Sequence, residues 1–300
     1  MNPAGERVAA IDVGSNTILL TVAEYDPASG LVLLEEGEDQ PRLAAGLSVT
    51  KRLGEDAIKR SVVALTRMRD TCHRLGVQRV TAVATAAVRE ATNGADFVGR
   101  VQALDIPLRV IPPETEAALS YRSAAYRFPG EERTLVADIG GGSLEIIGAV
   151  SSTLGLSRSL PLGAVRLTEL RAPGAELREH IRRLLAEAVP PEWNGSRIIG
   201  SGGTFATLAS MTLAQRDSRT KQIHGTVVHR GEVRRWHESL AKMSPEKRRE
   251  TPGLKPERAD IIVAGLAVVA ELMKAAGATE VRVSGFGLRD GLLLEMVGLG

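Results

Sequence analysis

The chain has a single cysteine, Cys72, among its 300 residues, and aromatic residues make up only 3% of it. One cysteine excludes an intramolecular disulfide and is typical of a protein from a reducing compartment. So few aromatic rings argue against the stacking platforms that bind single-stranded nucleic acid. The sequence also lacks a G-x-x-x-x-G-K-[ST] loop, which excludes a P-loop nucleotide site. Nucleic acid is therefore not an expected partner.

Long apolar runs are missing as well. The longest, residues 261–270, is flanked by Asp260 and Glu271 and is about half as long as the ~20 residues that cross a membrane. The N-terminal segment reaches a polar turn by Asp12, which leaves no room for the apolar core of a signal peptide. We therefore expect a soluble, cytoplasmic protein with no membrane partner.

Charge is nearly balanced overall, with a formal net charge of +2. Residues 151–300 carry 22 Lys and Arg against 16 Asp and Glu, whereas residues 1–150 carry 16 against 20. The densest basic stretch runs from Arg216 to Arg235, and a second lies at 247–258. Two interpretations stay open: solvated helix faces, which is the usual one, or a track for a long polyanion.

What the sequence does contain is a repeated pattern in residues 11–17 and 137–143. Each copy is a β-branched apolar run that ends in an aspartate (Asp12 or Asp138), followed by a turn of small residues and a second strand-like run. Small residues let a tight turn point its N–H groups at a phosphate, and an aspartate is a hard ligand for the Mg²⁺ that accompanies phosphates. This strand–turn–strand setting differs from the strand–loop–helix of dinucleotide-binding motifs. Two copies favour two half-sites for one polyanion over two unrelated glycine hairpins.

The order of the expected elements is also repeated. The first half is predicted as strands at 8–12, 18–25 and 31–36, a helix at 51–75, and then alternating strands and helices. The second half restarts with strands at 134–138, 144–150 and 156–161 and ends with a helix at 287–297. This order predicts an α/β protein of two duplicated domains, 1–125 and 126–300, with the active site in the cleft between them. The closing helix is a candidate to pack back on the first domain.

Several segments taken together resemble the exopolyphosphatase / guanosine pentaphosphate phosphohydrolase family. They are IDVGSNTILLTV (11–22), ATAAVREATN (84–93), ETEAALSYRSA (114–124), ADIGGGSLEI (137–146), LPLGAVRLTE (160–169), IIGSGGT (198–204), PERADIIVAGLAVV (256–269) and VSGFGLRDGLLLE (283–295). The family belongs to the superfamily of actin, sugar kinases and heat-shock ATPases. The resemblance therefore implies two ribonuclease H-like (actin-like ATPase) domains, in the short form of the family.

The resemblance also implies which residues carry the chemistry. Glu116 matches the family's residue that activates the attacking water. Asp138 and Glu145 match its other catalytic carboxylates, as metal ligands or water-orienting groups, and with Asp12 they would hold Mg²⁺ or Mn²⁺. The residues expected to bind phosphates of the substrate are Ser15, Asn16, Thr17, Arg89, Gly141, Gly142, Ser143, Gly202, Gly203 and Thr204.

One segment departs from the family's pattern. Most relatives have Ser-Gly and then two adjacent acids, whereas this chain has Pro112-Pro113 followed by Glu114-Thr115-Glu116. The second acid is displaced by one position, and proline stiffens the loop. Glu116 keeps its assignment, but the helper role of its usual neighbour does not carry over.

The resulting hypothesis is an exopolyphosphatase, a metal-dependent hydrolase that releases terminal orthophosphate from inorganic polyphosphate. Removal of the 5′ phosphate from guanosine pentaphosphate, a nucleotide of the stringent response, is the enzymatic alternative. An actin-like ATPase switch and a non-catalytic polyphosphate-binding protein are alternatives from other classes. A homodimer is expected from the family alone.

Overall fold

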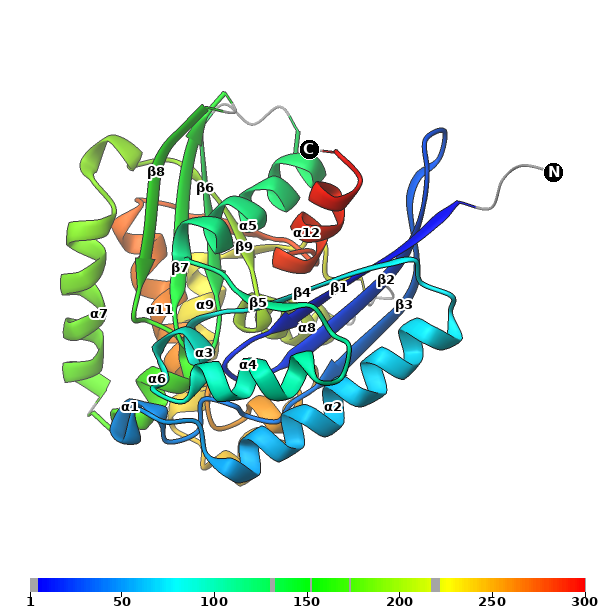
Figure 1. Ribbon diagram of the computed structural model, residues 1–300. Coiled ribbons are helices and arrows are strands. Elements are labelled where there is room, and N and C mark those ends of the chain that lie inside the picture. The colour runs from blue at the N-terminus through cyan, green and yellow to red at the C-terminus, as the bar shows by residue number, and fades with distance from the viewer. Residues whose placement is uncertain (1–4, 130–132, 152, 173, 217–221, 300) are drawn as a thin grey trace. The chain divides into compact units, whose positions relative to one another are not determined.

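The computed structural model describes residues 5–129, 133–151, 153–172, 174–216 and 222–299 (Figure 1). The chain divides into two compact units. Unit 1 is Met1–Ser123 with Leu288–Gly300, and unit 2 is Ala124–Gly287. The sequence predicted a domain boundary after residue 125, and the structure divides the chain after residue 123. The C-terminal segment 288–300 is grouped with unit 1 rather than with unit 2.

Unit 1 contains a five-stranded sheet in the order β3-β2-β1-β4-β5. Its elements are β1 (Glu6–Val13), β2 (Ile18–Asp26), β3 (Gly30–Asp39), α1 (Leu47–Thr50), α2 (Glu55–Arg74), β4 (Arg79–Ala84), α3 (Ala86–Glu90), α4 (Gly94–Gln102), β5 (Leu108–Val110) and α12 (Leu288–Met296). Helix α5 (Pro113–Arg127) begins in this unit and ends in unit 2.

Unit 2 contains a six-stranded sheet in the order β10-β11-β9-β6-β7-β8. Its elements are β6 (Arg133–Ile139), β7 (Leu144–Val150), β8 (Thr153–Leu160), α6 (Ala164–Glu169), α7 (Gly174–Ala188), the 3₁₀ turn η1 (Pro191–Trp193), β9 (Arg197–Ser201), α8 (Gly203–Gln215), β10 (Val227–His229), α9 (Arg230–Ala241), α10 (Pro245–Arg248), the 3₁₀ turn η2 (Pro256–Arg258), α11 (Ile262–Ala275) and β11 (Glu280–Val283).

The two sheets share one topology. In unit 1, β1 pairs antiparallel with β2 and parallel with β4, and the sheet continues to β3 on one side and β5 on the other. In unit 2, β6 takes the place of β1, with β7 and β8 antiparallel on one side and β9 and β11 parallel on the other. Strand β10 extends this second sheet antiparallel to β11. The predicted duplicated α/β organisation is therefore confirmed.

Helices cover both faces of the unit 1 sheet (Figure 1). On one face α2 and α4 bury apolar side chains that include Ile58, Leu65 and Phe97. On the other face α5 and α12 contribute Leu119 and Leu292. Each such side chain, when fully buried, contributes roughly 1.5–3 kcal/mol. Helix α12 is thus held to unit 1 by its own apolar face.

The long helix of unit 1 is shorter at its start than its apolar spacing predicts. It was expected at 51–75 and runs from Glu55 to Arg74. Lys51 has a left-handed backbone with φ of 56°, and Gly54 is extended, so the first helical turn forms only after them. At the other end Gly76 follows with φ of 62°, a conformation that favours glycine and ends helices.

In unit 2, α7, α8, α9 and α11 pack around one large core that includes Phe205 and Trp193. Strand β8 begins at Thr153, three residues before the predicted start. Strand β10 was not predicted, because three residues are too few for alternation to be recognised. The strand predicted at 144–150 coincides with β7.

Candidate active site

The two repeated segments form matching hairpin turns. In unit 1 the turn Gly14–Thr17 joins β1 to β2, and Gly14 N–H donates to Thr17 O over 3.0 Å. In unit 2 the turn Gly140–Ser143 joins β6 to β7, and Gly140 N–H donates to Ser143 O over the same 3.0 Å. The similarity read from the sequence therefore extends to the hydrogen bond that closes each turn.

The side chains of the first turn are buried although they are polar. Ser15, Asn16 and Thr17 are 4%, 5% and 7% exposed. Two backbone carbonyls of this turn accept hydrogen bonds from a neighbouring segment: Ala44 N–H donates to Ser15 O over 2.9 Å, and Arg42 N–H donates to Asn16 O over 3.1 Å. A turn whose carbonyls are held in this way leaves its N–H groups on the opposite side, where they suit an anion.

The second turn carries two carboxylates that face each other. Asp138 on β6 and Glu145 on β7 are directly opposite in the antiparallel register, so their side chains leave the same face of the sheet about 5 Å apart. In the first turn the equivalent pair is Asp12 and Leu19. The unit 2 hairpin therefore presents two hard oxygen ligands at this place, and the unit 1 hairpin presents one.

Serine hydroxyls hold both carboxylates of unit 2. Ser201 Oγ on β9 donates to Asp138 Oδ2, and Ser159 Oγ on β8 donates to Glu145 Oε1, each over 2.9 Å. The four residues form a row across neighbouring strands, since Asp138 pairs with Ser201 and Glu145 with Ser159 in the sheet. Glu145 is only 1% exposed. A buried carboxylate is stabilised by such hydrogen bonds and by cations.

The turn before α8 lies directly against Asp138. Gly202 has a positive φ of 85°, and a Cβ there would lie 2.5 Å from Asp138 Oδ1. A Cβ on Gly203 would lie 2.0 Å from the guanidinium of Arg258. Gly202 is required here by its positive φ and by the Ile139 carbonyl, which would lie 2.7 Å from a Cβ, whereas the absence of a side chain at Gly203 lets the Arg258 guanidinium lie beside the N-terminal end of α8. Arg258 was not among the predicted site residues, although the PERAD segment that contains it was one of the matching segments.

Thr204 has a different environment from the two glycines. It is 2% exposed, and a Cβ on Gly265 of α11 would lie 2.6 Å from Thr204 Oγ1. Its hydroxyl therefore packs against α11. What Thr204 can offer to a phosphate at this end of α8 is its backbone N–H.

Glu116 and Arg89 are brought together in unit 1. Glu116 lies in the first turn of α5 and is 8% exposed. Arg89 Nη1 donates to Glu116 Oε2 over 3.2 Å and to Ile111 O over 2.8 Å. The helix N-terminus and the guanidinium both place positive charge beside this carboxylate. The sequence indicated each residue separately but not that they form a pair.

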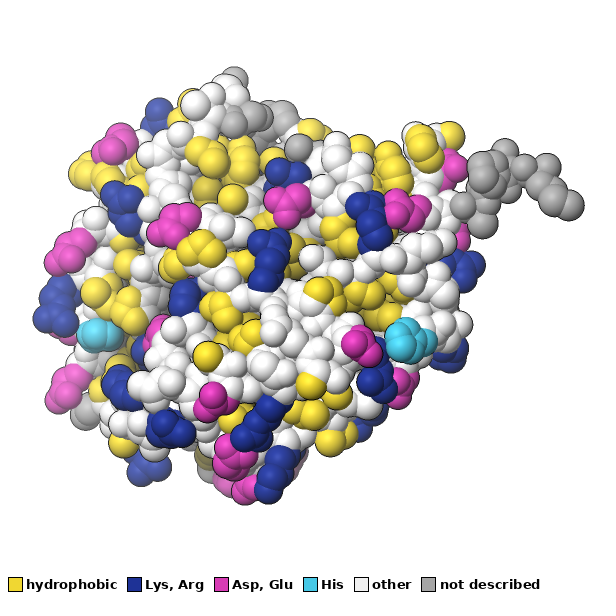
Figure 2. All heavy atoms as spheres, viewed as in Figure 1, with side chains coloured by type: hydrophobic (Ala, Val, Ile, Leu, Met, Phe, Trp, Pro, Cys, Tyr) yellow, Lys and Arg dark blue, Asp and Glu magenta, His cyan; other side chains and the backbone are white. Residues whose placement is uncertain are grey.

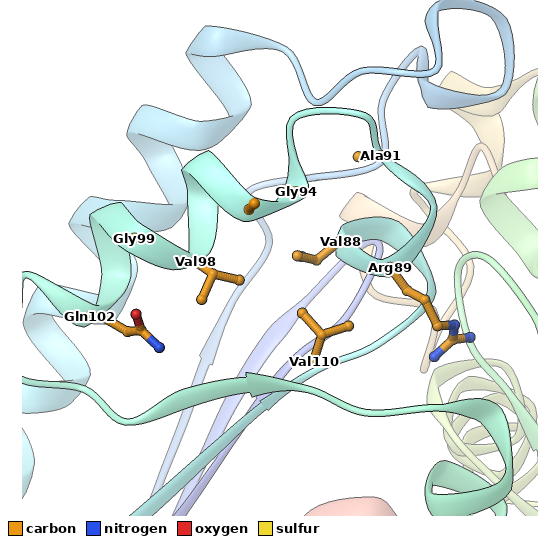
Figure 3. A pocket seen from close by; sticks show the side chains of 9 residues that line it. Val88, Arg89, Ala91, Gly94, Val98, Gly99, Gln102 and Val110 are labelled. Carbon is orange, nitrogen blue, oxygen red and sulfur yellow. The ribbon is translucent and has the colours of Figure 1, made fainter.

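A pocket of about 470 Å³ adjoins Arg89 (Figure 3). Its walls come from α3, α4 and β5, and Val88, Val98 and Val110 face one another across it. Gln102 lies at one end. The lining residues, which all belong to the described part of unit 1, include no aromatic ring. The pocket is therefore a mostly aliphatic hollow with an arginine at its border.

Each turn, taken by itself, carries oxygen donors of the kind a divalent cation takes. In unit 2 these are Asp138 and Glu145; in unit 1 they are Asp12 and the buried Asn16 Oδ1, which has no hydrogen-bond donor within the described ranges. A cation or a water bound to it would satisfy such an acceptor. Across the described residues, no three His, Cys, Asp or Glu side chains gather as a metal cluster. Mg²⁺ needs only one or two carboxylates when phosphates and waters complete its shell, so the residues present suit it.

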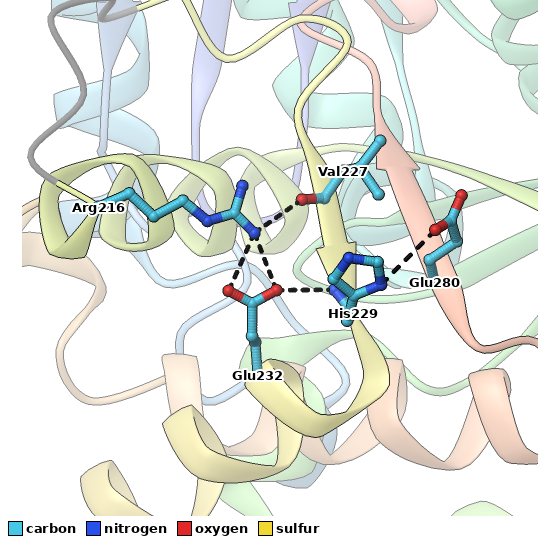
Figure 4. A network of polar contacts seen from close by, with 5 residues as sticks. All are labelled: Arg216, Val227, His229, Glu232 and Glu280. Atoms are coloured by element: carbon cyan, nitrogen blue, oxygen red, sulfur yellow. Dashed lines mark hydrogen bonds and ion pairs between the residues drawn. The ribbon is translucent and has the colours of Figure 1, made fainter.

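Part of the basic stretch of unit 2 is engaged in ion pairs (Figure 4). Arg216 follows the last residue of α8 and donates to both carboxylate oxygens of Glu232 over 2.9 Å. Glu232 also accepts a hydrogen bond from the backbone N–H of His229, the residue before α9. Partial burial by itself would raise the pKa of Glu232, but the hydrogen bonds from the His229 N–H and the Arg216 guanidinium outweigh it, so the pKa is lowered. Arg234 lies 3.8 Å from Glu238. These contacts favour the interpretation of the stretch as an ion-paired helix surface over a polyanion track.

The remaining charges do not add a continuous basic stripe on the face shown in Figure 2, where Lys and Arg are interspersed with Asp and Glu. Arg219 and Lys221 of the same stretch lie outside the described residues.

Burial raises the pKa of the Cys72 thiol to about 11, which leaves it protonated near neutral pH. No described helix combines the length and the apolar character that a membrane span requires.

Comparison with known proteins assigns the chain to a family and agrees with the fold. The model of the Ppx/GppA phosphatase family matches residues 21–299. An uncharacterized protein of Streptomyces coelicolor is 33% identical over 97% of this chain and 90% of its own length. The crystal structure of the Aquifex aeolicus Ppx/GppA family member has a TM-score of 0.82 and 30% identity over 97% of each chain. An exopolyphosphatase from Cytophaga hutchinsonii has a TM-score of 0.89 and 24% identity, over 98% of this chain and 99% of its own.

The duplicated sheets thus define a two-domain α/β protein, as expected. Within that class, the chain belongs to the Ppx/GppA phosphatase family. Members of this family are phosphohydrolases, so a hydrolase of phosphate compounds is the coarse function that the comparisons support.

Proposed function

We propose that the protein is an exopolyphosphatase that releases terminal orthophosphate from inorganic polyphosphate. The observation that carries the proposal is the pair of matched turns, each closed by the same 3.0 Å hydrogen bond and each preceded by an aspartate. Each turn provides successive N–H donors that suit a phosphate group. Membership of a phosphatase family supports the same reaction class.

In this reaction the scissile P–O bond of the terminal anhydride breaks while a water oxygen bonds to phosphorus. Glu116 would take the proton of that water as general base. Arg89 orients the carboxylate through their 3.2 Å contact and has further N–H groups that can bind a phosphoryl oxygen. The turn N–H groups hold the terminal phosphate in place, which supplies most of what phosphoryl transfer requires.

Mg²⁺, with Mn²⁺ as the substitute, is the proposed cofactor. In unit 2, Asp138 and Glu145 would hold it, and Asp12 is the corresponding ligand that the sequence predicts in unit 1; the metal would neutralise charge on the phosphoryl oxygens. The serines that donate to Asp138 and Glu145 orient these carboxylates, as outer-shell partners of metal ligands do.

Polyphosphate is favoured over guanosine pentaphosphate because the chain has few rings with which to bind a base. Phe97 and Phe205 are completely buried in the two cores. Phe128 and Phe286 pack on either side of His224, with ring centroids 4.7 and 4.9 Å away. Inorganic polyphosphate needs no base-stacking ring.

One observation favours guanosine pentaphosphate as the second candidate. The pocket beside Arg89 has a volume of about 470 Å³, which is within the range of small-ligand sites. Aliphatic walls with an amide at one end suit a nucleoside. The two substrates can therefore be separated by filling this pocket.

The test compares phosphate release from short polyphosphate, long polyphosphate, guanosine pentaphosphate and ATP, measured side by side. Gly99 of α4 lines the pocket, and no heavy atom lies within 4 Å of a Cβ placed there, so Gly99→Leu should fill it. Gly54→Leu, at a second glycine with open space around it, is the control. We expect polyphosphate to be the best substrate and Gly99→Leu to leave its turnover unchanged.

A wild-type preference for guanosine pentaphosphate that Gly99→Leu abolishes would select the second candidate. A preference for ATP would select a nucleotide-driven switch, and binding of polyphosphate without phosphate release would indicate a binding protein. Homodimerisation stays a prediction, and light scattering on the purified chain measures it.

A further inference from the structure

Helix α6 holds three consecutive carbonyls of the second turn. Ala164 N–H donates to Gly140 O over 3.0 Å, and the N–H groups of Val165 and Arg166 donate to Gly141 O over 3.0 and 3.1 Å. The third carbonyl is held by a side chain, since Arg166 Nε donates to Gly142 O over 2.8 Å. The first turn of α6 therefore sits against the carbonyl side of the turn.

This arrangement decides where the turn's N–H groups point. In a trans peptide the N–H lies opposite the carbonyl of the preceding residue. With the carbonyls of residues 140, 141 and 142 held toward α6, the N–H groups of Gly141, Gly142 and Ser143 point away from it. Successive N–H groups that converge on one side form an anion-binding nest.

Glycine peptides need such restraint more than others. Glycine populates positive and negative φ almost equally, so a peptide in a run of three glycines can rotate and exchange its carbonyl for its N–H. The contact with α6 is close: a Cβ on Gly163 would lie 2.3 Å from Gly141 O. For Gly142 O, Arg166 Nε is the donor that the described residues supply. Arg166 is thus what opposes rotation of the Gly142–Ser143 peptide.

The first turn solves the same problem in another way. Asn16 occupies the place of Gly142, and its carbonyl accepts the main-chain N–H of Arg42 over 3.1 Å. A backbone donor in unit 1 and a side-chain donor in unit 2 therefore hold equivalent carbonyls. A hydrogen bond to the same carbonyl of the turn thus recurs in both units, from a backbone donor in one and a side chain in the other. This recurrence indicates that the orientation of the peptide after Asn16 and of the peptide after Gly142 matters.

We propose that Arg166 is a positioning residue that holds the Gly142–Ser143 peptide with its N–H toward a substrate phosphate. The inference rests on the proposed phosphohydrolase function and names a further residue of that site. Arg166 acts through the backbone of the turn. A guanidinium N–H suits this task because charge-assisted hydrogen bonds to oxygen are strong and directional.

The experiment compares Arg166→Met and Arg166→Lys with Arg7→Met. Arg7 is a matched control, because its Nη1 donates to Leu75 O over 2.7 Å in unit 1 and it takes no part in the proposed site. Binding of inorganic tripolyphosphate is measured by calorimetry on the full chain, together with KM, kcat and Tm. A hydrogen bond to a charged group such as phosphate contributes roughly 10- to 100-fold to affinity, so we expect Arg166→Met to weaken tripolyphosphate binding by about 10- to 100-fold.

Arg166→Lys should recover part of this affinity, since an ammonium can still donate to Gly142 O. Arg7→Met should lower Tm while leaving the affinity unchanged. An Arg166→Met protein with a lower Tm but the wild-type affinity would overturn the inference, and so would a wild-type protein that binds no tripolyphosphate. Wild-type binding without phosphate release would refute the proposed function alone, because the Arg166 comparison rests on binding.

Discussion

Replacing Glu116 by glutamine tests the proposed base with the least change in shape. The substitution removes the carboxylate that lies 3.2 Å from Arg89 Nη1 and keeps a side chain of the same length. A general base contributes about 10²–10⁴-fold to the rate, which corresponds to roughly 3–5 kcal/mol of activation free energy. Phosphate release should therefore fall by at least 100-fold.

The loss of the ion pair affects folding separately. The side chains of Arg89 and Glu116 are 22% and 11% exposed, so the pair is partly buried, and the substitution would leave Arg89 its hydrogen bond to the Ile111 carbonyl. We expect Glu116→Gln to lower the free energy of unfolding by about 1–3 kcal/mol. Urea unfolding measures this cost independently of turnover.

A second acid in the same helical turn provides the control. Glu114 also lies in the first turn of α5 but is exposed, so Glu114→Gln changes the same helix-end charge without touching Arg89. The assay is release of orthophosphate from tripolyphosphate at saturating Mg²⁺, below the unfolding transition of each variant. Retention of more than about a tenth of wild-type activity by Glu116→Gln, or an equal loss in Glu114→Gln, would refute the assignment.

The other predictions concern the metal and the packing of unit 2. Asp138→Asn and Glu145→Gln should each shift the Mg²⁺ concentration for half-maximal activity upward, because each removes an anionic ligand; titration curves identical to wild type would remove both from the metal site. Gly148→Ala should destabilise the protein by roughly 1–3 kcal/mol, since its Cβ would lie 2.5 Å from the Trp193 ring. Gly99→Ala, inside helix α4 where the added Cβ meets nothing within 4 Å, should cost no stability in the same urea titration, because alanine is the better helix former.

The hairpins were predictable because their signals are local. An apolar run that ends in an aspartate, followed by small residues and a second apolar run, specifies strand, turn and strand within about 15 residues. The direct opposition of Asp138 and Glu145 follows from the four-residue turn between their strands. The repeat of this pattern was then enough to predict a duplicated fold.

Contacts between separate segments were not predictable in the same way. Arg89 lies in α3 after β4, whereas Glu116 lies in the first turn of α5 after β5, and their pairing depends on how β4 and β5 align in the sheet. The same holds for Arg258, which reaches Gly203 from 55 positions further along the chain. Spacing along a sequence encodes which face a residue occupies, but not which distant residue faces it. The catalytic roles of these residues stay predictions.

The two turns also differ in how easily a mutation can remove the hydrogen bond that holds the equivalent carbonyl. In unit 1 the Asn16 carbonyl is held by a main-chain N–H, which every residue except proline supplies, so almost any substitution at position 42 retains the donor. In unit 2 the Gly142 carbonyl is held by a side chain, which a single codon change can remove. If the proposed function holds, evolution can therefore adjust phosphate binding by the second turn by changing one residue outside it, whereas among the described contacts of the Asn16 carbonyl only a proline at position 42 would remove the donor.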